Sequence, residues 1–251
     1  MIAWRAILTA ICMLGLPTMA DGPETIPRIA IIIDDLGYGL AAGERAVSLP
    51  GPVAYAVLPA TPRGRVLAEK AHANGKEVLL HLPLQAATHK QTDEPGGLLL
   101  DMTRGQFAST FTESFESVPH VVGINSHRGS LLTRHPGHMA WLMEEISQRG
   151  KLFFVDSYTT HESVALKLAR EAGVPAVRRD VFLDPDKAPG TVEREFARLK
   201  RLARQRGFAV GIGHPYPQTL SLLEDELPKL EDEGFELVSI SRYVALKNET
   251  D

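Results

Sequence analysis

The chain has 251 residues, of which 44% are hydrophobic and 23% are charged, an ordinary composition for a globular protein with one large core. Its 27 basic and 31 acidic residues give a net charge of −4 at pH 7, and this balance argues against a nucleic-acid partner. Because the sequence shows no internal repeat, low-complexity tract or domain linker, we expect a single domain over residues 21–251.

The first twenty residues differ from the rest of the chain. Arg5 precedes a mostly apolar stretch, residues 6–16, and small residues then precede a possible cleavage site after Ala20. Since a bilayer span needs roughly 20 apolar residues, we expect residues 1–20 to be a cleaved signal peptide, with a retained membrane anchor as the alternative. The only cysteine, Cys12, lies in this segment, so the mature chain would contain no disulfide. The sequence therefore predicts a periplasmic or secreted protein without a stable membrane anchor.

The next element is a run without polar side chains, residues 29–33, which ends in the adjacent carboxylates Asp34 and Asp35. Such a run is typical of a strand buried on both faces of a parallel sheet, and these folds place their chemistry at the carboxyl ends of the strands. One aspartate could cap the following helix while the other is solvated. The functional alternative is that one binds a cation and the other acts as a base.

Short apolar runs alternate with longer amphipathic stretches through the remainder of the chain. Thr61-Pro62 is typical of a helix start, and Asn74-Gly75 of the end of the same helix. Residues 191–206 place an apolar stripe on one helical face and arginines elsewhere, which predicts a solvated basic surface. Further strands are predicted at residues 53–57, 78–80, 121–124, 152–155, 181–183, 208–212 and 235–240.

This alternation of strands and helices implies a parallel sheet, either open and doubly wound or closed into a barrel. We favour an α/β fold with a distorted or incomplete (β/α) barrel of about seven parallel strands. The polar residues 86–101 are predicted to form a loop over the rim of the site.

Polar side chains recur where the other predicted strands end. His81, His127, Asp156 and His214 each follow an apolar run, as the two aspartates do. Since the carboxyl ends of parallel strands lie on one face, these groups should face one another. Neutral imidazole and carboxylate are ligands that zinc accepts, usually as three protein groups with one open position in a catalytic site. The pattern therefore predicts a metal site.

Six blocks of this sequence carry the polar residues at the predicted strand ends: Ile33–Gly37, His81–Leu84, Asn125–Ser130, Phe154–Ser157, Arg179–Asp184 and Gly213–Pro217. In this order they resemble the motifs of the divergent polysaccharide deacetylase family. The resemblance extends over nearly the whole mature chain and implies a remote branch of the polysaccharide deacetylases. Those enzymes have a distorted barrel and remove N- or O-acetyl groups from cell-wall sugars.

In that family a pair of aspartates supplies a base and a metal ligand, and two histidines four residues apart supply the other ligands. Here His81 matches the first histidine, but the second position is Gln85, and a neutral amide is a poor replacement for imidazole on zinc. His127 could take the place of the missing second histidine. The sequence then predicts a site for one divalent ion, most readily zinc, held by Asp35, His81 and His127. The alternative is that the site has lost its metal.

The resemblance also implies the roles of the other groups. Asp34 would be the base and His214 the acid that protonates the leaving sugar. Asn125 and Ser130 would hold sugar hydroxyls, with a turn role for Asn125 as the alternative. Asp156 would contact substrate or orient His214, with a helix cap as the alternative.

Three functions remain at this stage. The favoured one is a metal-dependent hydrolase that removes acetyl groups from an envelope or extracellular polysaccharide. The alternative, which Gln85 favours, is a non-catalytic periplasmic protein that binds a glycan or a protein on a degenerate barrel. A phosphate-ester hydrolase ranks lowest, because no glycine-rich phosphate cradle follows a strand, although Arg128 lies near the rim.

Overall fold

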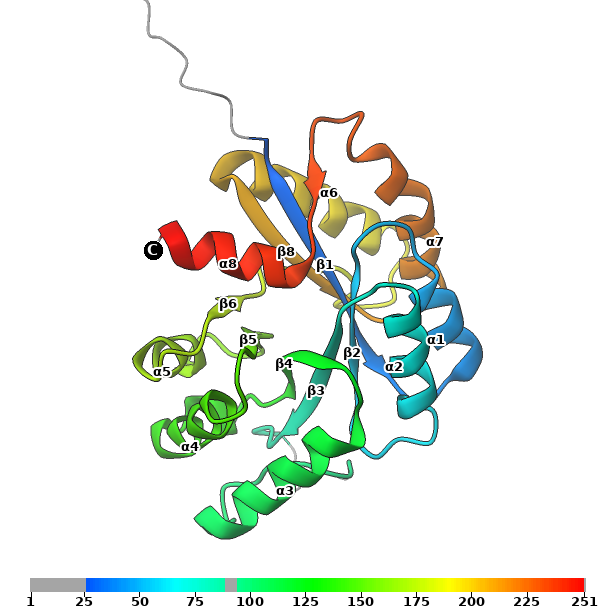
Figure 1. Ribbon diagram of the computed structural model, residues 1–251. Coiled ribbons are helices and arrows are strands. Elements are labelled where there is room, and N and C mark those ends of the chain that lie inside the picture. The colour runs from blue at the N-terminus through cyan, green and yellow to red at the C-terminus, as the bar shows by residue number, and fades with distance from the viewer. Residues whose placement is uncertain (1–25, 89–93, 251) are drawn as a thin grey trace, which may run out of the picture.

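The computed structural model describes residues 26–88 and 94–250, so the expected signal peptide at residues 1–20 lies outside the described residues. Nine parallel strands form one sheet in this part of the chain (Figure 1). They are β1 (Arg28–Leu36), β2 (Ala54–Val57), β3 (Val78–Leu84), β4 (Val121–Arg128), β5 (Phe153–Asp156), β6 (Ala176–Arg178), β7 (Val181–Phe182), β8 (Phe208–Gly213) and β9 (Glu236–Leu237).

Helices follow most of the strands, and all of them except the last, α8, cover the outer face of the sheet (Figure 1). They are α1 (Leu40–Val47), α2 (Gly64–Ala73), α3 (Arg104–Ser117), α4 (Pro136–Ser147), α5 (Ala165–Glu171), α6 (Thr191–Arg206), α7 (Pro217–Glu226) and α8 (Ile240–Thr250), with short 3-10 turns at Leu132–Arg134 and Leu227–Lys229.

The sheet is curled but not closed. Its strand order is β6-β5-β4-β3-β2-β1-β8-β7, with β9 beside β1, and no pairing joins β6 to β7 among the described residues. Figure 1 shows α8 in the opening between β6 and β8, where Tyr243 and Val244 pack against the inner face of the sheet. The expected incomplete barrel of parallel strands is therefore confirmed, with nine strands instead of about seven.

Strand alternation divides the core into two layers. On β1, Ile29, Ile31 and Ile33 pack outward against the helices, and Ala30 and Ile32 face the interior of the barrel. All five side chains are fully buried, which explains why this run has no polar residue. The same alternation on the other strands determines which polar side chains reach the interior.

Most predicted elements are confirmed, with local differences. The helix expected from Thr61 begins at Gly64, because Thr61 donates its hydroxyl to Leu58 O and caps nothing. Its predicted end is correct: Asn74 is the C-cap, and Gly75 takes a left-handed φ of 68°. The strand expected at residues 235–240 shortens to β9 because α8 begins at residue 240, and the three-residue strand β6 was not predicted. Among the described residues, no helix combines the length and apolar character needed to cross a membrane.

Candidate active site

The polar side chains of the site continue the inner face of the barrel. Asp34 comes two residues after the inward-facing Ile32, and His214 two residues after Ile212. His81 likewise follows Leu79 by two residues. Since successive side chains of a strand alternate between its faces, all three groups point into the carboxyl end of the barrel.

Asp35 reaches the same place through a distortion of β1. By strict alternation it would point outward, but its backbone is left-handed, with a φ of 58°, and the pairing of β1 with β2 shifts register between Ile33 and Leu36. A left-handed non-glycine residue in a strand costs on the order of 1–3 kcal/mol, so the surrounding structure must hold it there. The strain brings two adjacent carboxylates to one site.

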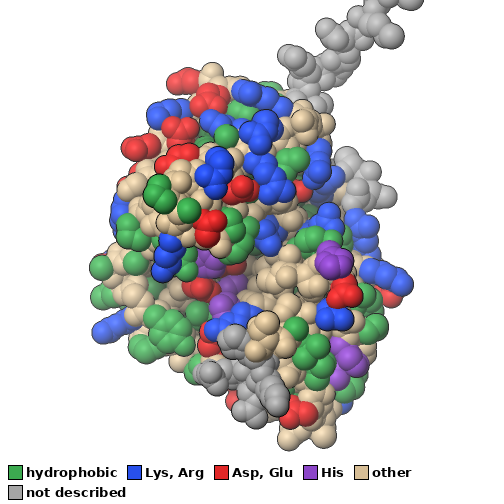
Figure 2. Space-filling view, turned by 180° about the vertical axis from the view of Figure 1, so that it is seen from behind, with side chains coloured by type: hydrophobic (Ala, Val, Ile, Leu, Met, Phe, Trp, Pro, Cys, Tyr) green, Lys and Arg blue, Asp and Glu red, His purple; other side chains and the backbone are tan. Residues whose placement is uncertain are grey.

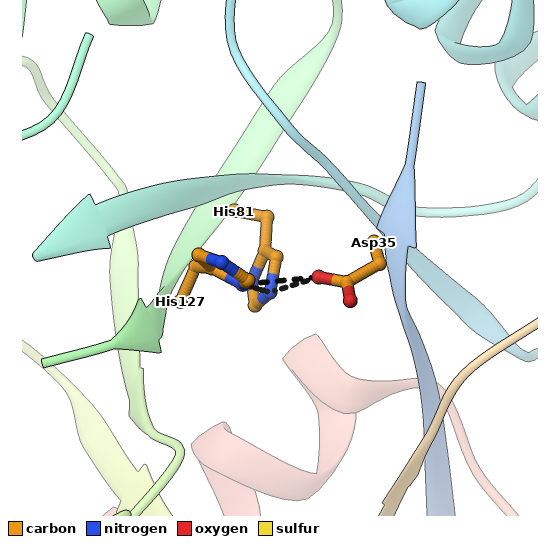
Figure 3. Close-up of side chains that lie close together, drawn as sticks. All are labelled: Asp35, His81 and His127. Carbon is orange, nitrogen blue, oxygen red and sulfur yellow. Dashed lines mark hydrogen bonds and ion pairs between the residues drawn. The ribbon is translucent and has the colours of Figure 1, made fainter. Parts of the chain in front are cut away.

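Asp35, His81 and His127 form a compact triangle of potential ligand atoms. Asp35 Oδ1 lies 3.0 Å from His127 Nδ1 and 3.1 Å from His81 Nε2, and the two nitrogens are 3.0 Å apart. Figure 3 shows the carboxylate and the two imidazoles pointing toward one another from β1, β3 and β4. Within the described residues, these three form the group of acids and histidines close enough to hold a metal ion.

The donor set fits a divalent cation. Asp35 Oδ1 is buried, yet it forms no well-aligned hydrogen bond with the described residues. A buried, unsatisfied carboxylate oxygen beside two imidazole nitrogens is the arrangement that a metal ion would satisfy. Three protein ligands of this kind leave one coordination position open, as catalytic zinc sites do.

Electrostatics favour a negative Asp35. Burial alone would raise the pKa of this carboxyl, but the imidazoles of His127 and His81, 3.0 and 3.1 Å from Oδ1, outweigh it and hold the pKa well below its usual range. Burial opposes charge on His127 too, but Asp35 and Glu94 raise its pKa to about 9. Without a cation, a proton on His127 therefore balances the carboxylate.

Asn125 links His81 to Asp34. Its Oδ1 lies 2.8 Å from His81 Nδ1, and its Nδ2 donates to Asp34 Oδ1 at 2.7 Å. The side chain is fully buried and bonded on both sides. We therefore assign Asn125 to the positioning of His81 and Asp34 and not to the sugar contact that the sequence suggested.

Asp34 is a buried acid with a raised pKa. Its side chain is 4% exposed, and burial is the main cause of the shift, which the nearby His81 and His214 only partly offset. A carboxylate whose pKa is raised toward neutrality is a stronger base than an exposed one. The structure places this carboxyl on the wall of the site cavity.

His214 is held by Asp184, which sequence reasoning did not assign to the site. His214 Nδ1 lies 2.9 Å from Asp184 Oδ1, while Asp184 Oδ2 accepts hydrogen bonds from His214 N and from the Thr219 hydroxyl, both at 2.7 Å. Although burial opposes it, the bond to Asp184 raises the pKa of His214. Asp184 follows the predicted strand at 181–183, so the rule that found the other strand-end groups could have found it.

Glu94 also belongs to the site and was not predicted. Its Oε2 lies 2.7 Å from His127 Nε2, and its Oε1 accepts from Arg128 Nη2 at 3.0 Å. It comes from the polar loop 86–101, of which residues 89–93 lie outside the described part of the chain. No periodic pattern marks a loop residue, so the sequence carried no signal for this contact.

Two other expected site residues, Asp156 and Ser130, make contacts of a different kind. Gln85, at the position of the family's second histidine, accepts a hydrogen bond from Leu100 N at its Oε1, at 2.8 Å. Asp156 accepts from Tyr158 N and from the Ser163 hydroxyl, so it orders the turn before α5 and does not reach His214. Ser130 accepts from Ala87 N at 3.0 Å and does not line the site cavity.

The site opens into a cavity of about 200 Å³. Figure 2 shows histidine and acidic side chains in a hollow of this face. Beyond Asp34, His81, His127 and His214, its walls include Arg179 and Phe182. A larger cavity, about 600 Å³, lies at the opposite, amino end of the barrel and has mainly apolar walls without histidine. The groups capable of chemistry are therefore concentrated at the carboxyl end.

The chain is similar in sequence to known proteins. The profile of the divergent polysaccharide deacetylase family matches residues 31–244. An uncharacterized protein of Haemophilus influenzae is 34% identical over 206 residues, covering 82% of this chain and 73% of that protein.

Solved structures share the fold. That of an uncharacterized Agrobacterium tumefaciens protein superposes with a TM-score of 0.83 at 21% identity, covering 88% of this chain and 91% of that one. A CE4 family pseudoenzyme from Bacillus anthracis superposes with a TM-score of 0.53 at 12% identity, covering 88% and 66%. Because one of these neighbours is described as a pseudoenzyme, the fold alone does not decide whether the site is active.

Proposed function

The chain belongs to the divergent polysaccharide deacetylase family, and from that premise we propose that it is a metal-dependent hydrolase that removes acetyl groups from an envelope or extracellular polysaccharide. The observation that carries this proposal is the triangle of Asp35, His81 and His127 beside a buried acid, Asp34. A glycan-binding surface has no need for a buried, unsatisfied carboxylate and titratable groups with perturbed pKa values.

Asp35, His81 and His127 would hold one divalent ion, which we propose to be zinc. Such an ion supplies Lewis-acid chemistry: it polarises an acetyl carbonyl and makes a water molecule easier to deprotonate. Glu94 orients His127 through the ring nitrogen that faces away from the other ligands, and Asn125 does the same for His81. Such outer contacts fix the tautomer and the ring orientation of a ligating histidine.

Asp34 takes a proton from water in the proposed reaction. Its raised pKa suits a base that works near neutral pH, and Asn125 fixes its orientation by donating to Oδ1. The second oxygen, Oδ2, lies 3.6 Å from His81 Nε2, next to the ligand triangle. The base is therefore adjacent to the position where the scissile carbonyl must lie.

His214 gives a proton to the leaving sugar amine or hydroxyl. Asp184 accepts a hydrogen bond from Nδ1 of His214, so Nε2 of His214 faces Asp35 and lies 3.5 Å from Asp35 Oδ2. A histidine whose pKa is raised by a buried carboxylate carries the proton that a general acid needs. Base and acid come from β1 and from the end of β8, which are neighbouring strands of the sheet.

The second candidate is a non-catalytic binding protein, and the observation that favours it is Gln85 at the usual position of a ligating histidine. Its side-chain oxygen is engaged with Leu100 N at 2.8 Å. His127 supplies the missing imidazole from the neighbouring strand β4. We therefore favour the hydrolase.

We also propose that the mature protein acts outside the cytoplasmic membrane after removal of residues 1–20. Support comes from the apolar N-terminal segment with its small residues before Ala20. N-terminal sequencing of the protein recovered from the periplasmic fraction would check this, and an N-terminus that retains Met1 there would contradict it.

The first test is metal content. Purified residues 21–251 are dialysed against a weak chelator, analysed for metals, and compared with His127→Ala and with His161→Ala, a control histidine exposed between β5 and α5. We expect about one ion per chain in the wild type and in His161→Ala, and its loss in His127→Ala. Acetate release from partially acetylated chitosan and acetylated xylan then tests hydrolysis. A protein that binds none of zinc, manganese, cobalt and nickel would contradict the proposal and favour the binding protein.

A further inference from the structure

A second cavity, of about 470 Å³, adjoins the site cavity. The two share the side chains of Arg179 and Phe182 in their walls, so a chain of sugars that enters one can continue into the other. We call this second cavity the arginine pocket. Its other charged wall residues are Arg178, Arg198, Arg206, Asp180 and Glu195.

The arginine pocket carries an excess of positive charge. Of its four arginines, Arg206 pairs with Asp180 at 3.2 Å and Arg198 with Glu195 at 3.0 Å. Among residues 26–88 and 94–250, no carboxylate lies within ion-pair distance of Arg178 or Arg179. Two guanidinium charges are therefore available for a ligand.

These two guanidinium groups are held in place. Arg179 donates from Nε to Ser157 O at 2.6 Å and from Nη2 to Tyr158 O at 3.2 Å, and it lies over the ring of Phe182 at 4.9 Å. Arg178 lies over the ring of Tyr158 at 4.2 Å. A guanidinium that is already fixed loses little conformational entropy when it binds an anion, and its planar fork matches a carboxylate or a phosphate.

The positive charge is local. The whole chain has a net charge of −4, yet Figure 2 shows many Lys and Arg side chains, with Asp and Glu side chains among them, above the hollow that contains the histidines. A concave surface with an excess of one sign of charge raises the local concentration of an oppositely charged ligand. The excess of positive charge in the arginine pocket is therefore a local feature and does not follow from the net charge of the chain.

We propose that the arginine pocket binds a negatively charged substituent, a carboxylate or a phosphate, on a sugar next to the acetylated one. The substrate is then an acidic polysaccharide. This inference rests on the proposed function, because it assumes that a glycan occupies the site cavity. Arg179 lines both cavities, whereas Arg178, Arg198 and Arg206 line the arginine pocket and not the site cavity.

The test compares glycans of equal length and different charge. Zinc-loaded residues 21–251 are titrated with hexagalacturonate, with a phosphate ester of maltohexaose and with neutral chitohexaose by calorimetry in low salt. The variant Arg178→Gln/Arg198→Gln alters the pocket. The variant Arg65→Gln/Arg201→Gln removes the same charge from exposed arginines on α2 and α6 outside it.

We expect the wild type to bind at least one anionic glycan more tightly than chitohexaose, and the better anion identifies the substituent. The pocket variant should lose roughly three- to tenfold in affinity for that glycan, because two cations beside the bound anion are removed. The control variant should lose less than about twofold, because its two arginines lie outside the pocket. Affinity for chitohexaose should not change in either variant.

Two results would overturn the inference. If the two variants lost affinity equally, only the overall electrostatic field of the protein would attract the glycan. If chitohexaose bound as tightly as both anionic glycans, the pocket would have no preference for charge. Neither result bears on the proposed hydrolase function, which the measurements of metal content and acetate release test separately. A protein that binds none of the three glycans contradicts the inference even if it hydrolyses acetate from other substrates.

Discussion

Glu145 on α4 and Asp34 on β1 are both buried carboxylates, 6% and 4% exposed, but they differ in the charge of the side chains around them. Glu145 pairs with Arg104 at 2.7 Å and with Arg149 at 2.8 Å, one arginine for each oxygen. Asp34 has an amide, Asn125, and two imidazoles, His81 and His214, around it. One acid is matched by two permanent charges, and the other by a neutral amide and two imidazoles, which can gain or lose a proton.

This difference separates an acid that serves the fold from one that serves chemistry. Although burial opposes it, the two arginines lower the pKa of Glu145, so this group stays ionised and helps to join α3 to α4. Burial raises the pKa of Asp34, and the neighbouring charges offset this only partly. Burial of the Asp34 carboxylate makes it a stronger base than an exposed aspartate, and the same burial lowers the stability of the folded protein.

Replacing Asp34 with asparagine should have the largest effect. We expect Asp34→Asn to reduce acetate release by roughly 10²- to 10⁴-fold, because the base is lost. Metal content should be retained, and the free energy of unfolding should be unchanged or higher, since a neutral amide has no charge to desolvate. Steady-state kinetics, elemental analysis and urea unfolding measure the three quantities. Asp156→Asn is the control, because that buried acid orders a turn and should leave metal content and acetate release unchanged.

The next prediction concerns the contact between Glu94 and His127. Glu94→Gln removes the carboxylate that orients a proposed metal ligand, and such changes weaken metal binding by roughly 10- to 100-fold. Competition with a chromophoric chelator measures the zinc affinity. Glu69→Gln is a matched control, because Glu69 lies 2.8 Å from His120 Nε2 in another glutamate–histidine pair, remote from the site. Equal zinc affinity in Glu94→Gln and wild type would remove Glu94 from the site.

Glu145 should behave in the opposite way to Asp34. Glu145→Gln should lower the free energy of unfolding by about 2 kcal/mol at pH 7, because two arginines lose a charged acceptor, and it should leave metal content unchanged. The folded pKa of Glu145 lies below its ordinary value of 4.5, so its contribution is complete above that pH and is lost as the pH falls through the folded pKa.

Urea unfolding of wild type and Glu145→Gln between pH 7 and pH 3 should therefore show their stabilities converging at the acid end. Glu144→Gln, an exposed neighbour that also contacts Arg104, should change stability by less than about 0.5 kcal/mol. If Asp34→Asn proved as destabilising as Glu145→Gln, the distinction between the two acids would be wrong.

The sequence predicted the framework of the site better than its details. Apolar runs that end in polar residues identified the strands that carry Asp34, His81, His127 and His214, because burial on both faces leaves a clear pattern. Strand alternation, applied to residues 153–156, would also have shown that Asp156 turns away from the inward-facing Phe153 and Val155. The structure was needed for the left-handed turn at Asp35 and for Glu94, since the first is a backbone distortion and the second a contact made by a loop.

The smallest expected effect concerns Gln85, the position at which the sequence departs from its family. Gln85→His should not raise zinc affinity by more than about twofold, since the side chain at this position bonds Leu100 N and not the ligand triangle. Loss of that hydrogen bond should lower the free energy of unfolding by about 1 kcal/mol. Chelator competition and urea unfolding measure both, with Gln148→His on the exposed end of α4 as the control for an added histidine. A tenfold gain in zinc affinity for Gln85→His alone would show that the site lacks a ligand, so that His127 had not replaced the family's second histidine.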